Sequence, residues 1–283
     1  MKELEPKIRG RFAPSPTGRM HLGNVYAAVQ SWLSARSRGG EWIVRIEDID
    51  RQRSRPEYAE QLLRDLEWLG LGWDGPVEWQ SRRSEFYEAA LGRLAAEGRT
   101  YGCTCTRAQI LVSSAPHQSD GRVIYGGHCR PQGMPRVVAP PQERHAVRLW
   151  VPDRDVEFTD RNFGPQRVNL ARECGDFVLR RSDGAWAYQL AVTVDDALMG
   201  ITEVVRGADL LLSAAQQIYL FELLGYEPPE YAHIPLLLNA QGERLAKRDR
   251  AESLDELRPK STPEHVLARV LTPAELALWQ KLK

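Results

Sequence analysis

The sequence lacks the features of a membrane or exported protein. Residues 1–6 contain no apolar segment of a signal peptide, and no apolar run in the 283-residue chain is long enough to cross a bilayer. Internal repeats and low-complexity tracts are absent as well. We therefore expect a soluble cytoplasmic protein without a membrane partner.

The chain has no excess of charge of either sign. Its 38 basic and 38 acidic residues cancel, so no net field attracts it to nucleic acid or to an anionic membrane. A local basic face is compatible with this balance. The net charge therefore neither supports nor excludes an RNA partner.

Cysteine is scarce, with four residues in the chain. Three of them, Cys103, Cys105 and Cys129, lie close together, which is a poor basis for a disulfide framework in a reducing cytosol. Three thiolates in one short region predict a structural zinc site, and the alternative is a set of reduced cysteines that bind no metal. Two histidines lie nearby, His117 and His128, but His128 adjoins Cys129 and would complete the tetrahedron only with local strain.

Hydrophobic patterning predicts an α/β fold with a parallel sheet. A strand from Ile8, a loop rich in proline and glycine, a helix over 26–33 and a strand over 42–46 form a βαβ unit. Apolar spacing predicts amphipathic helices over 58–69 and 86–95. A chain of this length accommodates one sizeable α/β domain with an insertion.

We divide the chain into four parts. The parallel sheet begins within residues 1–98 and is completed within 186–250, since helical and strand signals resume at Tyr188. Residues 99–185 contain short β-like runs broken by prolines, which indicates an inserted domain. Residues 251–283 are predicted to form a short helical segment.

The loop over 11–24 lies between a predicted strand and helix, where backbone N–H groups and the helix dipole can bind phosphate. Gly18 and Gly23 would let the backbone approach a nucleotide closely, and His21 can donate to a developing phosphoryl charge. A His-x-Gly sequence alone is more typical of a turn whose histidine caps the helix. The whole string, however, resembles the HIGH-motif region of class I glutamyl-tRNA synthetases, in which A-P-S-P-T-G is a specific marker.

This resemblance implies a Rossmann-like class I aminoacyl-tRNA synthetase catalytic domain, with an inserted zinc-bearing acceptor-type domain and a short helical C-terminal segment. Asn24 replaces the second histidine of the motif and can still donate a hydrogen bond. Residues 244–248, Arg-Leu-Ala-Lys-Arg, resemble a degenerate KMSKS loop, although an isolated basic pentapeptide is usually a solvated surface. The resemblance implies that His21, Asn24 and Lys247 are catalytic. It also implies that they bind ATP together with Gly23 and Mg²⁺.

A second group of motifs resembles the glutamate pocket of the same family. Residues 45–54 resemble the R-I-E-D-T-D-x-x-R segment, in which Glu47 would bind the α-ammonium group. A substrate with two carboxylates needs more than one cation, and the resemblance assigns Arg11 and Arg206 to it, with Tyr188 as a hydroxyl donor and ring wall. The related glutaminyl enzymes have a different first loop and lack the V-R-G arginine, which argues for an acid substrate. The remaining predicted pocket residues are Phe12, Ala13, Pro14 and Ser15.

The resemblance also bears on the predicted zinc site. Short members of the family have a tyrosine at the position of Tyr125, so we expect Tyr125 to join the three cysteines as the fourth ligand, in place of His117 or His128. The role would be structural, because a catalytic zinc needs an open position near the ATP site.

The end of the chain separates two kinds of family member. Full-length members continue after the KMSKS loop into a helical domain that recognises the anticodon, whereas this chain ends at Lys283. It is similar in this respect to short members that attach glutamate to the queuosine base in the anticodon of tRNA(Asp). We therefore expect a monomer that activates L-glutamate to glutamyl-adenylate with ATP and transfers it to that base. A truncated or minimal glutamyl-tRNA synthetase, which charges the acceptor end, would have the same sequence features.

Two interpretations from other classes stay open. A nucleotidylyltransferase of the same superfamily shares the nucleotide loop but needs no amino-acid pocket, so Glu47, Tyr188 and Arg206 argue against it. A non-catalytic synthetase paralogue that binds RNA is supported by Asn24 and by the weak KMSKS match. Glutamate-dependent pyrophosphate exchange discriminates both from the synthetase.

Overall fold

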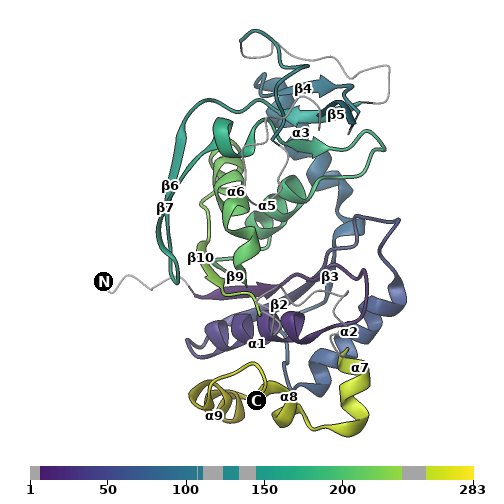
Figure 1. Cartoon of the computed structure of the whole chain (residues 1–283), viewed down its shortest axis with the longest axis vertical. Coiled ribbons are helices and arrows are strands. Elements are labelled where there is room, and N and C mark those ends of the chain that lie inside the picture. Colours follow the sequence, from purple (N-terminus) through teal and green to yellow (C-terminus); the bar gives the residue numbers. More distant parts are fainter. Residues whose placement is uncertain (1–6, 107, 111–123, 134–144, 238–252) are drawn as a thin grey trace.

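A computed structural model describes residues 7–106, 108–110, 124–133, 145–237 and 253–283. Parallel strands occupy the middle of the molecule, with helices on both sides, a small antiparallel sheet at one end and the C-terminal helices at the other (Figure 1). The predicted α/β class is confirmed. Within the described ranges, no helix combines the length and apolar character needed to cross a membrane.

The first half of the central sheet has the predicted βαβ order. Strands β1 (Arg9–Phe12) and β2 (Glu41–Ile46) pair in parallel, and α1 (Leu22–Arg36) connects them. After α2 (Pro56–Trp68), the short strand β3 (Glu78–Trp79) pairs with β2. Because a parallel sheet is covered on both faces, most residues of β1 and β2 are buried, and the buried side chains are apolar except for Arg11 and Arg45.

The second half follows later in the chain. Helix α5 (Tyr188–Leu198) leads to β9 (Glu203–Gly207), and α6 (Leu211–Leu223) leads to β10 (Glu230–Ile234). Strands β9 and β10 are parallel neighbours. The segment from Tyr188, in which the sequence shows both helical and strand signals, is therefore a helix.

The two halves meet at the start of β1. The backbone N–H of Thr202 donates to the carbonyl oxygen of Arg9 at 3.0 Å, which sets β9 beside β1. On the far edge, the hairpin of β6 (Asp155–Asp160) and β7 (Gly164–Asn169) pairs with β10, so the strand order is β7-β6-β10-β9. Part of the range 99–185, which we expected to form an insertion, thus joins the central strands.

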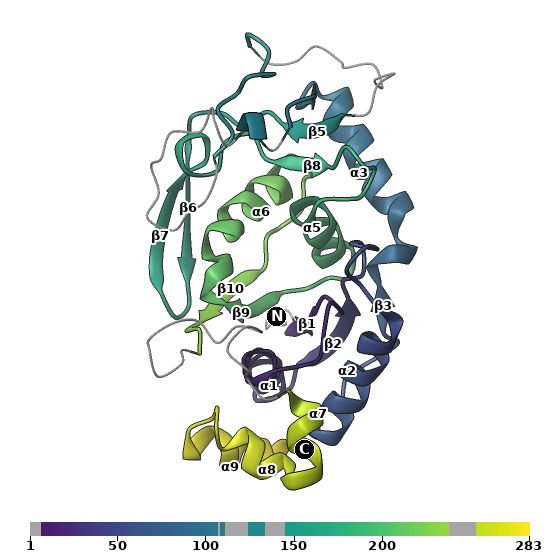
Figure 2. The same ribbon diagram turned by 45° about the vertical axis from the view of Figure 1, so that its right-hand side comes forward.

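The remaining strands form a separate antiparallel sheet in the order β4 (Thr100–Cys103), β5 (Ala146–Leu149) and β8 (Val178–Arg180). Helix α3 (Ser84–Ala96) leads into it, and the sheet lies beyond α5 and α6 (Figure 2). The short helical turns are η1 (Gln80–Arg82), η2 (Leu170–Cys174), η3 (Ala208–Leu210) and η5 (Arg258–Lys260).

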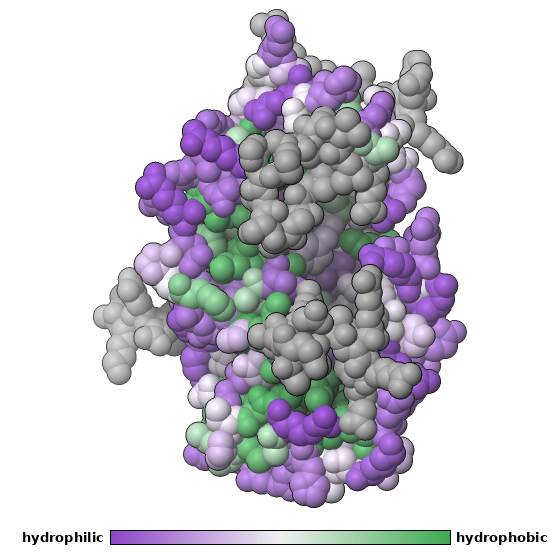
Figure 3. Space-filling model, viewed as in Figure 1, coloured by the Kyte–Doolittle hydropathy of each residue, from purple (hydrophilic) through white to green (hydrophobic). Residues whose placement is uncertain are grey.

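The chain ends in α7 (Leu254–Leu257), α8 (Pro263–Leu267) and α9 (Pro273–Leu282), as the helical prediction requires. These helices pack below α1 and α2, where apolar residues gather on the face drawn in Figure 3. Trp279 is buried there, and its indole N–H donates to the carbonyl oxygen of Leu69 at 3.1 Å. The C-terminal helices are therefore part of the main hydrophobic core.

A buried ionic network connects β2 to α5. Arg45 on β2 has no exposed surface and lies among three carboxylates. Its guanidinium group is 2.7 Å from Asp196, 3.2 Å from Glu47 and 3.7 Å from Asp195. Burial alone would lower the pKa of Arg45, but these carboxylates, Asp196 foremost, raise it, so the group stays charged.

Asp195 extends this network to α3 and the turn before it. Its carboxylate accepts hydrogen bonds from Gln80 at 2.8 Å and from the hydroxyl of Tyr87 at 2.8 Å. Arg83 donates to its other oxygen at 2.6 Å. Since Asp195 is fully buried, these bonds replace the water that its charge would otherwise need.

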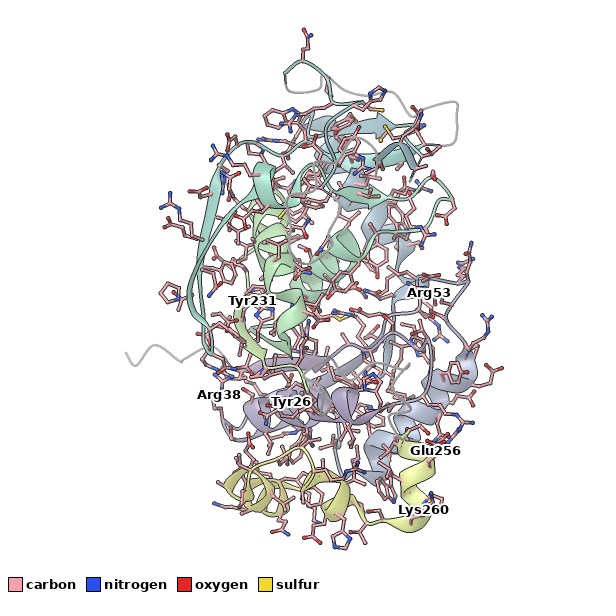
Figure 4. All side chains as sticks on the ribbon, in the orientation of Figure 1. Tyr26, Arg38, Arg53, Tyr231, Glu256 and Lys260 are labelled. Atoms are coloured by element: carbon pink, nitrogen blue, oxygen red, sulfur yellow. The ribbon has the colours of Figure 1, made fainter. Side chains whose placement is uncertain are left out.

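We expect Arg45→Met to destabilise the fold by about 3–5 kcal/mol, because it leaves buried carboxylates without their shared cation. Chemical denaturation followed by circular dichroism measures this loss. Arg53→Met is the matched control, since Arg53 forms an exposed ion pair with Asp50 at the edge of the molecule (Figure 4). An equal loss in both variants would contradict the role given to Arg45.

Candidate functional site

A cavity of about 490 Å³ lies where β1, β2, β9 and β10 end. In open α/β sheets this is where ligands bind, and Figure 2 shows these strands meeting near the centre of the molecule. Every described residue predicted for the glutamate and ATP sites lines the cavity. These residues are Arg11, Phe12, Ala13, Pro14, Ser15, His21, Gly23, Asn24, Glu47, Tyr188 and Arg206.

Lys247 and the rest of the KMSKS-like segment lie outside the described residues. The described residues that flank this segment can be placed. Leu237 lines the cavity, and Ser253 forms a β-bridge with His21. The chain therefore enters and leaves this segment next to the predicted nucleotide loop.

His21 caps the N-terminus of α1. Its Nδ1 accepts the backbone N–H of Gly23 at 3.1 Å, and the side-chain oxygen of Asn24 accepts the backbone N–H of His21 at 3.3 Å. A Cβ on residue 23 would lie 2.9 Å from the imidazole, so the cap requires glycine. Because Nδ1 accepts, the neutral ring carries its proton on Nε2. The capping and nucleotide-binding interpretations of His21 are thus compatible.

Arg11, at the end of β1, is buried and held along one edge. Its Nε lies 3.3 Å from Asp196, which also contacts Arg45. Burial raises the pKa of Asp196, but the charges of Arg45 and Arg11 outweigh this effect. The pKa therefore lies below its usual value, and the carboxylate is ionised. The two Nη groups of Arg11 form no hydrogen bond with any residue that the structure describes. Arg11 thus retains donors for a ligand in the cavity.

Glu47, directly after β2, is a buried carboxyl group beside the same cavity. One of its oxygens accepts a hydrogen bond from Arg45 at 3.2 Å. Burial raises the pKa of Glu47 to about 7, although Arg45 and Arg11 act in the opposite direction. The group therefore changes charge near neutral pH, and a cation placed beside it would stabilise the carboxylate.

Arg206, at the end of β9, is buried among uncharged partners. It donates to Nε2 of His233 at 3.0 Å and to the side-chain oxygen of Gln217 at 2.8 Å. A longer bond of 3.5 Å reaches the hydroxyl of Tyr188, and the guanidinium lies 5.2 Å from the centre of the Tyr231 ring. No ion pair between described residues includes Arg206. Its charge is available to an anionic ligand.

These groups define the chemistry that the cavity accepts. Arg11 and Arg206 provide two cations, and Glu47 provides one carboxyl group. An amino acid with two carboxylates and one ammonium group has the complementary set of charges. The loop at the start of α1 adds backbone N–H groups suited to phosphate.

The residues that hold this site are not among those predicted from the sequence. Arg45, Asp196, Gln217, His233 and Asp160 are buried polar side chains. A signal was present for all but Asp160, since each of the others interrupts or borders an apolar run, as His233 does in Tyr-Ala-His-Ile. Lining residues also missed include Thr17, Arg19, Tyr26, Asp209, Leu210 and Leu236. Figure 4 shows Tyr26 on α1, with Tyr231 on β10 above it.

The predicted zinc ligands gather away from the cavity. The sulfur atoms of Cys103, Cys105 and Cys129 all lie within 4.8 Å of one another. The hydroxyl of Tyr125 lies 3.5 Å from the sulfur of Cys103 and 3.8 Å from that of Cys105. It also accepts the backbone N–H of Cys129 at 2.6 Å. The four side chains thus surround one point, with a donor set suited to zinc.

The two histidines considered as alternatives are not part of this group. His117 lies outside the described residues, and His128 is not among the mutually close ligand atoms of the described chain. Burial opposes ionisation of Cys129, but hydrogen bonds from Thr104 and Cys105 lower the pKa of its thiol to about 6. Burial and the hydrogen bond to Cys129 raise the pKa of Cys105 to about 11, so Cys129 carries the negative charge of this pair and Cys105 must lose its proton when a metal binds.

Comparison with known proteins agrees with this geometry. The family of tRNA synthetases class I (E and Q), catalytic domain, matches residues 7–273. A glutamyl-Q tRNA(Asp) synthetase of Geobacter sulfurreducens is 51% identical over 251 residues, which cover 88% of this chain and 78% of that protein. The corresponding protein of Thiobacillus denitrificans is 48% identical over 280 residues, with 95% of this chain and 91% of that protein covered.

Solved structures show the same relationship. The crystal structure of a glutamate tRNA ligase from Elizabethkingia meningosepticum, in complex with its amino acid, is similar with a TM-score of 0.79 and 29% identity. The similarity covers 98% of this chain and 64% of that longer chain. The chain therefore belongs to the class I glutamyl- and glutaminyl-tRNA synthetase family, on the branch of the glutamyl-Q tRNA(Asp) synthetases.

Proposed function

We propose that the protein activates L-glutamate with ATP and transfers it to the queuosine base in the anticodon of tRNA(Asp). The observation that carries the proposal is one cavity in which Arg11, Arg206 and Glu47 lie beside a class I nucleotide loop. Identities of 51% and 48% with glutamyl-Q tRNA(Asp) synthetases support the choice of acceptor.

In the proposed pocket, charge complementarity selects glutamate. Glu47 binds the α-ammonium group, while Arg11 and Arg206 bind the carboxylates. Tyr188, which is within 3.5 Å of Arg206, supplies a hydroxyl group and a ring wall. The pocket is completed by Phe12, Ala13, Pro14 and Ser15.

Activation joins the α-carboxylate of glutamate to the α-phosphate of ATP and releases pyrophosphate. The positive end of the α1 dipole and the Nε2 proton of His21 stabilise negative charge on the phosphates. Asn24 keeps His21 in place through the cap. Lys247 is proposed to stabilise the departing pyrophosphate, and Mg²⁺ bound with ATP supplies further positive charge.

Transfer completes the reaction. A ring hydroxyl of queuosine attacks the carbonyl carbon of glutamyl-adenylate, an ester forms, and AMP leaves. The anticodon arm of the tRNA would occupy the open side of the cavity. This makes a queuosine-containing tRNA(Asp) the expected macromolecular partner.

We also propose that Cys103, Cys105, Cys129 and Tyr125 hold a structural Zn²⁺. The mutual proximity of three sulfur atoms and a phenol supports this site. Its residues do not line the cavity, which argues for a role in folding. When bound, the ion would cross-link the segment of Cys103 and Cys105 to that of Tyr125 and Cys129.

The division of the chain is part of the same proposal. Residues 99–185 contain the cysteine cluster and the antiparallel sheet, which supports an inserted domain. Residues 1–98 and 186–250 supply the two halves of the catalytic domain, and 251–283 supply the helical end. A monomeric state stays a prediction.

The first test supplies labelled glutamate and ATP to the protein with two tRNA pools. One pool comes from cells that make queuosine and the other from cells that do not. We expect label only on the queuosine-containing tRNA, because the other pool lacks the nucleophilic ring hydroxyl.

Equal labelling of both pools would identify charging of the acceptor end, the activity that the similarity to a glutamate tRNA ligase suggests as second candidate. Absence of label, together with absence of glutamate-dependent pyrophosphate exchange, would leave the non-catalytic paralogue as the better account.

The ionisation of Glu47 predicts a pH dependence for glutamate alone. The α-ammonium group binds the carboxylate form, and the pKa of Glu47 is about 7. The Michaelis constant for glutamate should therefore rise as pH falls below about 7, approaching about tenfold per pH unit, and level off above it. Pyrophosphate exchange with tRNA present measures this. Glu47→Gln should abolish the dependence, and a Michaelis constant for ATP with the same profile would contradict the assignment.

The cysteine cluster predicts one bound zinc per chain. Cys105→Ser should release zinc and lower the melting temperature, because metal binding contributes to folding. Metal analysis and calorimetry of the same preparations measure both effects. Cys174→Ser is the matched control, since Cys174 is not among the mutually close sulfur atoms. A zinc-free wild-type protein of normal stability would refute the site.

A further inference from the structure

Three neighbouring strands align three polar side chains in one row. Arg206 on β9 and His233 on β10 are direct cross-strand partners in the parallel register. Asp160, at the end of β6, lies on the other side of His233, because β6 is the next strand after β10. All three are buried, Asp160 and His233 completely. The row ends at Arg206, which lines the cavity.

The distances determine where the protons lie. The Nε of Arg206 always carries hydrogen, so Nε2 of His233, 3.0 Å away, must accept. The imidazole proton is then on Nδ1, which lies 2.6 Å from a carboxylate oxygen of Asp160. Asp160 thus selects the tautomer that allows His233 to accept from Arg206. A doubly protonated ring would place two donors against each other.

The charges around His233 agree with a neutral ring. Burial and the charge of Arg206 lower the pKa of His233 to about 4, and this outweighs the raising effects of Asp160 and of a hydrogen bond with the backbone of Leu210. The third neighbour, Tyr231, stacks on the imidazole with ring centres 5.9 Å apart. His233 is therefore an uncharged acceptor at neutral pH.

The N–H groups of Arg206 that have protein partners determine which of its donors a ligand can use. A guanidinium group has five N–H bonds. The Nε–H donates to His233, the two Nη1 hydrogens donate to Gln217 and Tyr188, and one Nη2 hydrogen donates to the carbonyl oxygen of Leu210 at 3.3 Å. One Nη2 hydrogen has no partner among the residues that the structure describes. The long bond to Tyr188 is weak and can be exchanged for a ligand oxygen.

We propose that Asp160 and His233 are positioning residues, which hold Arg206 by its Nε edge so that its Nη groups bind a carboxylate of the amino-acid substrate. This inference rests on the proposed function, since it assigns the residues that make Arg206 specific for glutamate. The imidazole between the two charges has a physical purpose. A carboxylate in direct contact would orient Arg206 but would also neutralise it, whereas His233 orients the guanidinium and leaves its charge for the substrate.

Two substitutions of His233 separate orientation from packing. Glutamine places an amide near the position of Nε2 and can still accept from Arg206. Asparagine places its amide near Nδ1 and keeps only the bond to Asp160. We expect His233→Gln to raise the Michaelis constant for glutamate by less than about threefold and His233→Asn to raise it by about tenfold or more. The Michaelis constant for ATP should stay unchanged in both.

The measurement is pyrophosphate exchange with tRNA present, with the melting temperature of each variant as the folding control. If His233 served only to fill the core or to anchor Asp160, His233→Asn would be the milder change, or both would affect glutamate and ATP alike. Either result overturns the inference.

Asp160→Asn tests the other end of the row. The single amide oxygen cannot accept both from the backbone N–H groups of Asn162 and Phe163, which bind one oxygen of Asp160, and from Nδ1 of His233, which binds the other. With the oxygen on the backbone N–H groups, the amide NH2 faces Nδ1 and moves the imidazole proton to Nε2, against the Nε–H of Arg206, so the Michaelis constant for glutamate should rise at least as far as in His233→Asn. An unchanged value in a folded variant would remove Asp160 from the row. A wild-type protein without glutamate-dependent exchange or glutamate binding would instead reject the proposed function, and this inference with it.

Discussion

The burial of Arg45 is the constraint on which the rest of the site depends. A guanidinium group with no exposed surface requires carboxylates around it, and the chain supplies them from Glu47, directly after β2, and from α5. Asp196 is shared with Arg11, and Glu47 accepts from Arg45 at the rim of the cavity. The buried ion pairs between the two halves of the sheet therefore also orient two residues that line the cavity, Arg11 and Glu47.

The two arginines of the cavity are held in different ways. Arg11 forms an ion pair with Asp196, and the same carboxylate also pairs with Arg45. The negative charge of Asp196 is therefore shared between two arginines. Among the described residues, the hydrogen-bond partners of Arg206 are uncharged, and His233 lies between it and the carboxylate of Asp160. Both arrangements orient a guanidinium group without cancelling its charge. Each arginine therefore retains N–H donors for the oxygen atoms of an anionic ligand.

Much of the site is visible in local sequence. The nucleotide loop, the strand before it and the helix after it occupy the predicted positions, because their glycine, proline and capping residues act within a few positions of one another. The same locality explains why the role of His21 as a cap was foreseeable. Residues 188–194 are different, since a run of apolar residues buried on all sides carries no period that separates helix from strand.

The sequence by itself determined the α/β class, the family, the predicted pocket residues and the cysteine cluster, because motif order and short-range spacing encode these features. Only the tertiary structure decided which polar residues are buried together. The hairpin of β6 and β7, within the range expected to be an insertion, pairs with β10 and thereby brings Asp160 to His233. Arg45 likewise meets Asp196 across 151 positions of the chain. No periodicity reports such pairs, since the partner of a buried charge is set by strand order and helix packing, and these depend on the whole chain.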